Sequence, residues 1–320
     1  MEAKQPRKMK LRSAILAVLL TCSWAVATGQ SDQRRSRIAV LDFGDTKTAR
    51  LTAANFSTAL ATADDMALVD RDLSRVAARG AGYGGSLNLS LQEARDLGAA
   101  IDCDFYIIGE SQTIRRSPST GLYFESYASL FLVSARTGRL LSWERPSFQG
   151  ASSEAAEKLL LAELLTRDLL YRYVIAIRRA QEDERHEREL ALERGAPVIE
   201  EAPNDANLET NGVRLPRPYR RLRPSYPDSA ARADAEGTVD VLADLDKEGE
   251  VTRVEVARWA GFGLDQAALD TARQLHFFPA MRDGIAIPMR VLLRYNFRRP
   301  QKQGMNEFWR VLSLANKRNQ

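Results

Sequence analysis

The pattern of apolar and polar positions divides residues 36–150 into short strands and amphipathic helices. The run Ile38-Ala39-Val40-Leu41-Asp42-Phe43 is almost continuously apolar, which is typical of a strand buried on both faces. Ser90 and Glu93 form a capping box that predicts the start of a helix reaching about residue 101. The predicted order is β-α-β-α-α-β-β-β, so we expect an α/β sandwich with a mixed sheet.

Residues 152–195 are predicted to form one long helix that is capped by Ser153. The leucines of its first half can share one face, whereas residues 178–194 are almost wholly charged. We expect the first half to pack on the sheet and the second half to be solvated; a coiled coil or partner helix is the alternative. A proline-containing linker follows at 196–222. Fully extended, the thirty residues 195–224 would span about 100 Å. The sequence thus allows two domains to lie far apart.

A second regular region covers residues 223–298, with the predicted order α-β-β-α-β. Residues 238–245 alternate apolar and polar side chains with a period of two, as in a strand with one buried face. The returning strand is predicted at 250–259, and the last strand at 287–297. A tail at 299–320 carries a short amphipathic helix, which we expect to pack beside the sheet. The whole chain is therefore predicted to be of the α+β class.

The first 29 residues have the form of an export signal. A basic stretch from Lys4 to Arg12 precedes a largely apolar stretch from Ala14 to Ala27, and small residues accompany its end. Fourteen helical residues span about 21 Å, short of a hydrocarbon core of about 30 Å. We therefore expect a cleavable signal peptide and a periplasmic protein. The alternatives are a retained inner-membrane anchor with the chain facing the periplasm, and a lipoprotein modified at Cys22.

Charge is distributed unevenly along the chain. Its 320 residues include 46 Lys and Arg against 42 Asp and Glu, a formal net charge of +4. Residues 1–29 alone contribute five basic residues and one acid, so the remainder is neutral, which argues against a nucleic-acid partner. Residues 151–213 carry a net charge of −6, and residues 214–320 carry +6. Five arginines between 214 and 223 can contact an anionic partner, lipid headgroups or the acidic segment; a solvated loop is the default.

Residues that usually carry catalysis or bind metals are few. Two cysteines and two histidines are few ligands for a metal site. Neither His186 nor His276 has another ligand or a base at the sequence spacing typical of metal sites or catalytic pairs. The glycine-rich stretch 80–85 lacks the preceding strand and the lysine of a phosphate-binding loop. Cys103 is expected to be a small core residue. We predict no cofactor, no metal and no enzymatic activity.

Five short motifs follow one another in the last region. They are Tyr226-Pro227, Glu236-Gly237-Thr238-Val239, the turn from Asp246 to Gly249, Leu264-Asp265-x-Ala267-Ala268, and Phe278-Pro279-Ala280 with Gly284 downstream. Together they resemble the motifs of the TonB C-terminal domain family. In order, they span residues 223–297. The resemblance implies a domain that binds a short extended segment of an outer-membrane receptor.

The resemblance further implies that this segment pairs with the last strand, Met289 to Phe297. An edge strand has unpaired N–H and C=O groups, to which a peptide can add as a further strand. The implied partner-binding residues are Arg223, Tyr226, Pro227, Arg290, Leu292, Arg294 and Tyr295. Arg223 stands where family members often have a glutamine, which points to an acidic partner. Prolines at 291 and 293 are expected to abolish binding and leave the fold intact.

The first domain resembles, through less specific motifs, periplasmic domains of the CsgG and TolB N-terminal type. These motifs are the strand at Ile38, Leu68-Val69-Asp70-Arg71, Ile107-Ile108-Gly109 and the hairpin at Thr137-Gly138. That resemblance implies an assembly or interaction module.

The leading hypothesis is a TonB-family periplasmic protein that binds an outer-membrane receptor or another envelope protein and transduces energy for transmembrane transport. A retained N-terminus would add an inner-membrane motor complex as a partner. The alternative is a non-energised scaffold or assembly protein of the cell envelope, with self-association into a homodimer as one form of it.

Overall fold

The computed structural model describes residues 35–62, 66–117, 121–194, 199–202 and 212–299, which fall within one compact unit beginning at Arg35. The export signal and the C-terminal tail helix predicted from the sequence lie outside the described residues. No helix within the described ranges combines the length and apolar character needed to cross a membrane.

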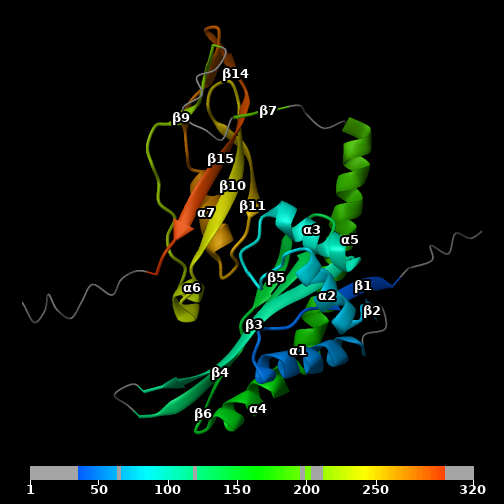
Figure 1. The fold of residues 1–320 in the computed structure, drawn as a ribbon. Coiled ribbons are helices and arrows are strands. Elements are labelled where there is room, and N and C mark those ends of the chain that lie inside the picture. Colours follow the sequence, from blue (N-terminus) through cyan, green and yellow to red (C-terminus); the bar gives the residue numbers. More distant parts are fainter. Residues whose placement is uncertain (1–34, 63–65, 118–120, 195–198, 203–211, 300–320) are drawn as a thin grey trace, which may run out of the picture. The chain divides into compact units, whose positions relative to one another are not determined.

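The first domain has the predicted order of elements, with one strand more than expected (Figure 1). Its elements are β1 (Ser36–Val40), α1 (Lys47–Leu60), β2 (Met66–Leu68), α2 (Arg71–Gly80), α3 (Leu91–Ile101), β3 (Phe105–Arg116), β4 (Tyr123–Ser134), β5 (Leu140–Glu144), β6 (Ser147–Gly150), α4 (Ser153–Leu164) and α5 (Arg167–Arg194). The capping box of α3 is present, because Ser90 Oγ accepts the Glu93 N–H and Glu93 accepts the Ser90 N–H.

The sheet of the first domain is mixed, as predicted. Its strand order is β2-β1-β3-β4-β5, and β6 pairs with the other end of β4. β1 runs parallel to β2 and β3, and the remaining pairs are antiparallel. The second arm of the predicted hairpin is thus two short strands, β5 and β6, which pair with different parts of β4.

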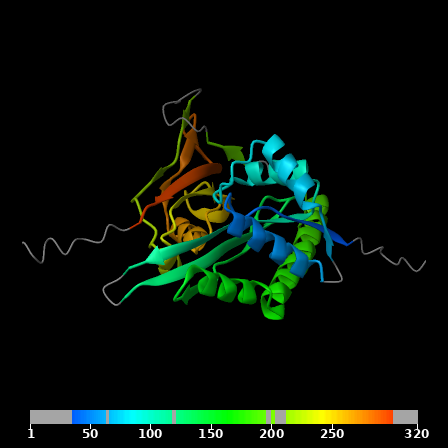
Figure 2. The same ribbon diagram turned by 60° about the horizontal axis from the view of Figure 1, so that its bottom comes forward.

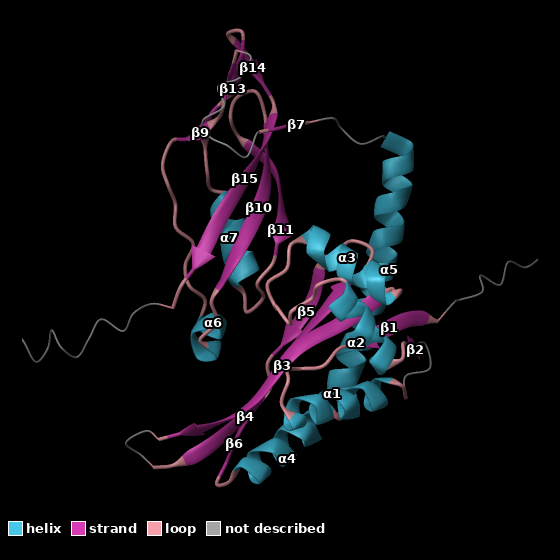
Figure 3. Ribbon diagram, viewed as in Figure 1, coloured by secondary structure: helices cyan, strands magenta, loops and turns pink. Residues whose placement is uncertain are grey.

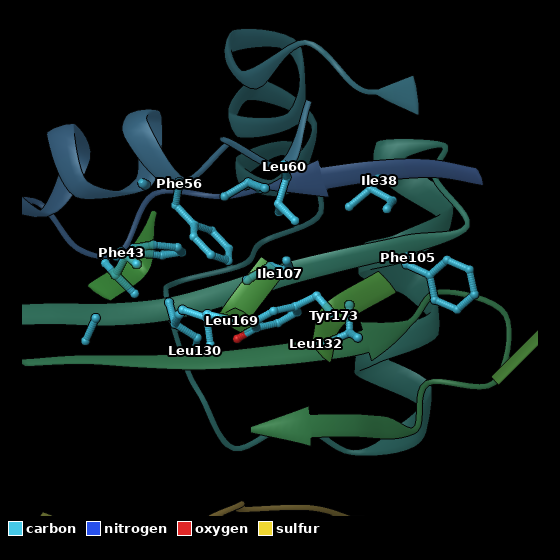
Figure 4. Packing of buried hydrophobic residues seen from close by; sticks show 14 of the residues in the cluster. Ile38, Phe43, Phe56, Leu60, Phe105, Ile107, Leu130, Leu132, Leu169 and Tyr173 are labelled. Atoms are coloured by element: carbon cyan, nitrogen blue, oxygen red, sulfur yellow. The ribbon is translucent and has the colours of Figure 1, made fainter. Parts of the chain in front are cut away.

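Helices cover both faces of this sheet (Figure 2). One face packs against α1, α4 and α5 through side chains that include Phe56, Leu60, Leu169 and Tyr173 (Figure 4). The other face packs against α2 and α3, and here the core also takes in Trp259 from the second domain. The nearly continuous apolar run at the start of the first domain therefore reflects burial of β1 from two sides.

The prediction of a single helix over 152–195 was wrong, because the structure has two helices. α4 ends at Leu164, and α5 begins at Arg167. Thr166 Oγ1 accepts the Leu169 N–H at 3.3 Å, so this threonine caps a new helix. The cap of α4 is Ser152, whose side chain accepts the Ala155 N–H, and not Ser153.

The second domain contains the predicted α-β-β-α-β elements together with six very short strands (Figure 3). Its elements are β7 (Glu200–Glu201), β8 (Val213–Arg214), β9 (Arg217–Pro218), α6 (Asp228–Ala233), β10 (Gly237–Leu245), β11 (Val251–Arg258), α7 (Leu264–Ala272), β12 (Phe277–Phe278), β13 (Ala280–Arg282), β14 (Ile285–Ile287) and β15 (Met289–Phe297). The main sheet has the order β11-β10-β15-β7, and α7 packs against its apolar face. β8 and β9 pair with β13 and β12, so this part of the predicted linker belongs to the domain.

The two domains are in contact, although the linker could reach much further. Trp259, which directly follows β11, is 1% exposed and stacks on Phe131 of β4 with ring centroids 5.8 Å apart. Its indole N–H donates to the Gly138 carbonyl at 3.0 Å. A side chain at Gly261 would collide with Phe131, and Gly261 also has a positive φ of 73°, so glycine suits this close approach.

Polar contacts accompany this apolar contact. The Asn88 side-chain amide donates to the Thr238 and Trp259 carbonyl oxygens at 2.8 and 2.6 Å, and its oxygen accepts the Thr238 N–H at 3.1 Å. Arg258 lies 3.0 Å from Glu93, and Arg139 lies 2.8 Å from Glu255. The first domain therefore holds the start of β10 and the end of β11 through packing and through side-chain hydrogen bonds to the backbone.

We expect Trp259→Ala to lower the free energy of unfolding by about 3–5 kcal/mol, because it leaves a large cavity beside Phe131. The matched variant Trp259→Phe keeps an aromatic ring but removes the indole donor, and should cost about 1–2 kcal/mol. Urea unfolding of the full chain followed by circular dichroism measures both changes. Equal stability of the alanine variant and the parent protein would contradict the described contact.

Candidate functional site

β15 separates its side chains onto two faces of the sheet. Val291, Leu293 and Tyr295 pack with α7 and its neighbours in the apolar core of the domain. Arg290, Leu292 and Arg294 alternate with them and lie on the opposite face. Leu292 is 42% exposed and stands between the two arginines, opposite Leu242 of β10. Three of the predicted partner-binding residues thus share one face.

Both arginines form paired hydrogen bonds with buried carboxylates of β10. Arg290 donates to the two oxygens of Asp244 at 2.6 and 3.0 Å, and Arg294 donates to those of Asp240 at 2.7 and 2.9 Å. These residues are direct cross-strand neighbours. The Asp244 and Asp240 side chains are 6% and 8% exposed. The hydrogen bond to Asp244 raises the pKa of Arg290, and that to Asp240 raises the pKa of Arg294.

The charged row continues across the sheet. Asp240 also lies 3.7 Å from Arg258 of β11, which in turn pairs with Glu93 of the first domain. Alternating charges therefore extend from Arg294 at the outer strand to α3 of the first domain. This arrangement compensates the buried Asp240 from two sides, as a carboxylate removed from water requires.

The direction of one hydrogen bond shows which backbone groups of β15 face outward. The Ala202 N–H donates to the Arg290 carbonyl at 2.8 Å, so the backbone groups of Arg290 point away from β10. Because N–H and C=O directions alternate along a strand, the groups of Leu292 and Arg294 also point outward. Those of Val291 and Leu293 point toward β10. The expectation for prolines at 291 and 293 was therefore wrong: they would break the sheet itself.

The outer side of β15 is covered only at its start. β7 pairs with Met289 and Arg290 in parallel, and the ladder goes no further. Among the residues that the structure describes, none pairs with the outer side of β15 from Val291 to Phe297. This stretch is the candidate binding edge.

The remaining predicted residues have different surroundings. The Tyr226 hydroxyl donates to the Ala235 carbonyl at 2.6 Å, and Pro227 precedes α6 as its N-cap residue. These two residues thus fix the ends of α6. Tyr295 lies on the core side, and burial raises the pKa of its hydroxyl, which has no hydrogen-bond partner within the described part of the chain.

The arginine cluster at 214–223 is exposed. Arg214, Arg217, Arg220, Arg221 and Arg223 form no ion pair with any residue that the structure describes. Leu222, which lies between Arg221 and Arg223 in the sequence, packs against the core cluster that contains Val291 of β15. Within the described part of the acidic segment, no carboxylate pairs with these arginines.

Two sites differ from the sequence expectation. His276 does have a partner, because its Nδ1 lies 2.7 Å from Glu250 Oε2 at the surface. Pairing of β7 with β15 was not predictable from the sequence, since a two-residue strand has no detectable period.

Cys103 is half-buried next to the first sheet, and burial raises the pKa of its thiol to about 12. Within the described ranges, no three His, Cys, Asp or Glu side chains are placed to hold a metal ion.

The comparisons with known proteins agree with the motifs of the second domain. The model of the Gram-negative bacterial TonB protein C-terminal family matches residues 223–298. Residues 223–298 are a TonB C-terminal domain. Protein TonB of Xanthomonas campestris pv. campestris strain B100 is 37% identical over 75 residues, which are 23% of this chain and 34% of the relative. The chain thus spans about a third of that relative's length.

Solved structures give weaker similarities. The TonB C-terminal domain of Pseudomonas aeruginosa is 20% identical, with a TM-score of 0.24, over 30% of this chain and 95% of that domain. Lipoprotein GNA1162 from Neisseria meningitidis is 13% identical, with a TM-score of 0.29, over 46% of this chain and 99% of the lipoprotein. The resemblance of the first domain to the CsgG and TolB N-terminal type stays a prediction.

We expect Arg290→Met alone to destabilise the fold by about 3 kcal/mol, because it leaves Asp244 buried and unpaired. The double variant Arg290→Met/Asp244→Leu removes both charges and should stay within about 1 kcal/mol of the parent protein. Urea unfolding of the three proteins at one pH gives the comparison. A double variant as unstable as the single one would show that the pair itself, rather than charge compensation, stabilises β15.

Proposed function

We propose that the TonB C-terminal domain of this protein binds an extended segment of an outer-membrane protein by adding it as a strand to β15. The observation that carries the proposal is the outward N–H and C=O groups of Leu292 and Arg294, which no described residue pairs. Such an edge offers main-chain hydrogen bonds for affinity and alternate side chains for specificity. The matched family supports an envelope protein as the partner.

The place of action that we propose is the periplasm, where the domain can meet such a segment. Proteins of the matched family are envelope proteins that face this compartment. Energy transduction requires in addition a link to an inner-membrane motor, and that link depends on retention of residues 1–29. We therefore propose strand addition as the activity, and energy transduction as its use only when the N-terminus is retained.

A non-energised scaffold is the second candidate, and the domain contact favours it. Trp259 and Asn88 fasten the TonB C-terminal domain to the first domain by packing and by backbone hydrogen bonds. A domain that is fixed to its neighbour presents its binding edge in a constant position, as a scaffold protein would. Self-association into a homodimer stays a prediction.

We expect Leu292→Pro to abolish binding of the partner segment, because proline removes an outward N–H without breaking a bond to β10. The matched variant Leu292→Ala keeps the N–H and should retain most of the affinity. Fluorescence anisotropy measures both, with synthetic peptides that tile the periplasmic segments of the outer-membrane receptors encoded in the same genome. Thermal unfolding verifies that both variants fold. Undiminished binding to the folded proline variant would reject β15 as the binding edge.

We expect the mature protein to begin after residue 29, since the apolar stretch is short for a membrane anchor. Mass spectrometry of the protein purified from the periplasm measures its N-terminus. A retained Met1 in a membrane fraction would instead favour the energised form.

A further inference from the structure

The chain supplies its own strand to the start of the binding edge. Glu200 and Glu201 of β7 run parallel to β15, opposite Met289 and Arg290. The next residue, Ala202, donates its N–H to the Arg290 carbonyl at 2.8 Å. These three residues therefore occupy backbone groups of the kind that a partner would use.

Each acidic side chain of β7 forms an ion pair with an arginine, and the two pairs lie on opposite faces of the strand. Glu200 accepts from Arg282 of β13 at 2.5 and 2.6 Å through its two oxygens. Glu201 lies 3.9 Å from Arg290, its cross-strand neighbour. Successive side chains of a strand point to opposite faces, so two adjacent carboxylates are recognised by two different arginines.

The third position of this internal strand selects a small side chain. Ala202 packs against the core cluster that contains Val291 and Leu275. Because Ala202 is partly buried there, we expect a small side chain to fit best at this position. The edge thus favours an acidic residue, a second acidic residue and a small residue in succession, in an extended segment that runs parallel to β15.

We infer that Glu200–Ala202 is an internal occupant of the binding edge, and that the partner is a parallel extended segment with two adjacent carboxylates followed by a small residue. The inference rests on the proposed function and adds the chemistry of the partner and its regulation. The partner displaces β7, takes over Arg282 and Arg290, and continues along the outer groups of Leu292 and Arg294. The exposed arginines at 214–223, which form no ion pair with a described residue, favour the same acidic segment.

The test uses the full chain and a fluorescein-labelled peptide with the sequence of residues 197–204, Pro-Val-Ile-Glu-Glu-Ala-Pro-Asn. The variant Glu200→Lys/Glu201→Lys reverses both ion pairs of the internal strand. It should bind this peptide at least about tenfold more tightly than the parent protein, because the edge is no longer occupied. Ala202→Pro opens the edge without changing the charge, by removing the N–H donor, and should give a similar gain.

The controls separate edge opening from charge and composition. Glu189→Lys/Glu193→Lys makes the same change in charge on the exposed part of α5, and should bind the peptide as weakly as the parent protein. A peptide with both glutamates replaced by lysine, and a peptide with the reversed sequence, should bind the opened variants at least about tenfold more weakly.

Two results would overturn the inference. Equal affinity of the peptide for the parent protein and both opened variants would show that β7 does not occupy the edge. Equal affinity of the opened variants for the acidic and lysine peptides would show that carboxylates are not recognised. Receptor peptides that bind the parent protein would leave the proposed function standing in either case. Tighter binding of the acidic peptide to opened variants, with no binding of any receptor peptide, would support the inference and reject the proposed function.

Discussion

Backbone hydrogen bonding at the outer side of β15 is the constraint on which the second domain depends. A strand at the edge of a sheet presents unpaired N–H and C=O groups, which water satisfies only until another strand approaches. The chain treats the two outer strands of this sheet differently. The end of β11 is held by Asn88 and by packing of Trp259, whereas β15 is covered only over Met289 and Arg290. Beyond Arg290 the sheet can therefore grow at β15, the strand that carries Arg290 and Arg294.

The two aspartates of β10 determine how those arginines are presented. Each guanidinium has five N–H donors, and its carboxylate partner in β10 uses two of them. The remaining donors point away from the carboxylate in a fixed fork, so little side-chain freedom is lost when a further carboxylate approaches. Glu201 already lies 3.9 Å from Nη1 of Arg290, the nitrogen that Asp244 does not use. Arg294 lies four residues further along and offers the same geometry, so a longer partner can place another carboxylate there.

The sequence predicted the elements with a clear period or a clear cap, and missed those whose position depends on distant residues. The capping box at Ser90 and the strand at β10 follow from local patterns, and both were confirmed. The alternation predicted one buried face, whereas Asp240 and Asp244 on the other face are buried as well, because the arginines of β15 cover them. The division at Thr166 was missed because apolar residues continue on either side of it, so that the stripe looks uninterrupted. The direction of the outer N–H groups of β15 depends on which neighbour pairs with Arg290, and no pattern within the strand contains that information. Burial of Trp259 likewise depends on Phe131, which is far away in the sequence.

Because β7 is part of the same chain, its effective concentration at β15 is high. A free partner must compensate by pairing with a longer stretch of β15. β7 follows α5 after only five intervening residues, and a short tether of this kind corresponds to an effective concentration on the order of millimolar. A free segment that copied only Glu200–Ala202 would lose this competition at micromolar concentration. A segment that also paired with the outer groups of Leu292 and Arg294 would gain main-chain hydrogen bonds that β7 does not make. The occupied start of β15 therefore rejects short acidic peptides and admits only a partner that follows the strand toward Phe297.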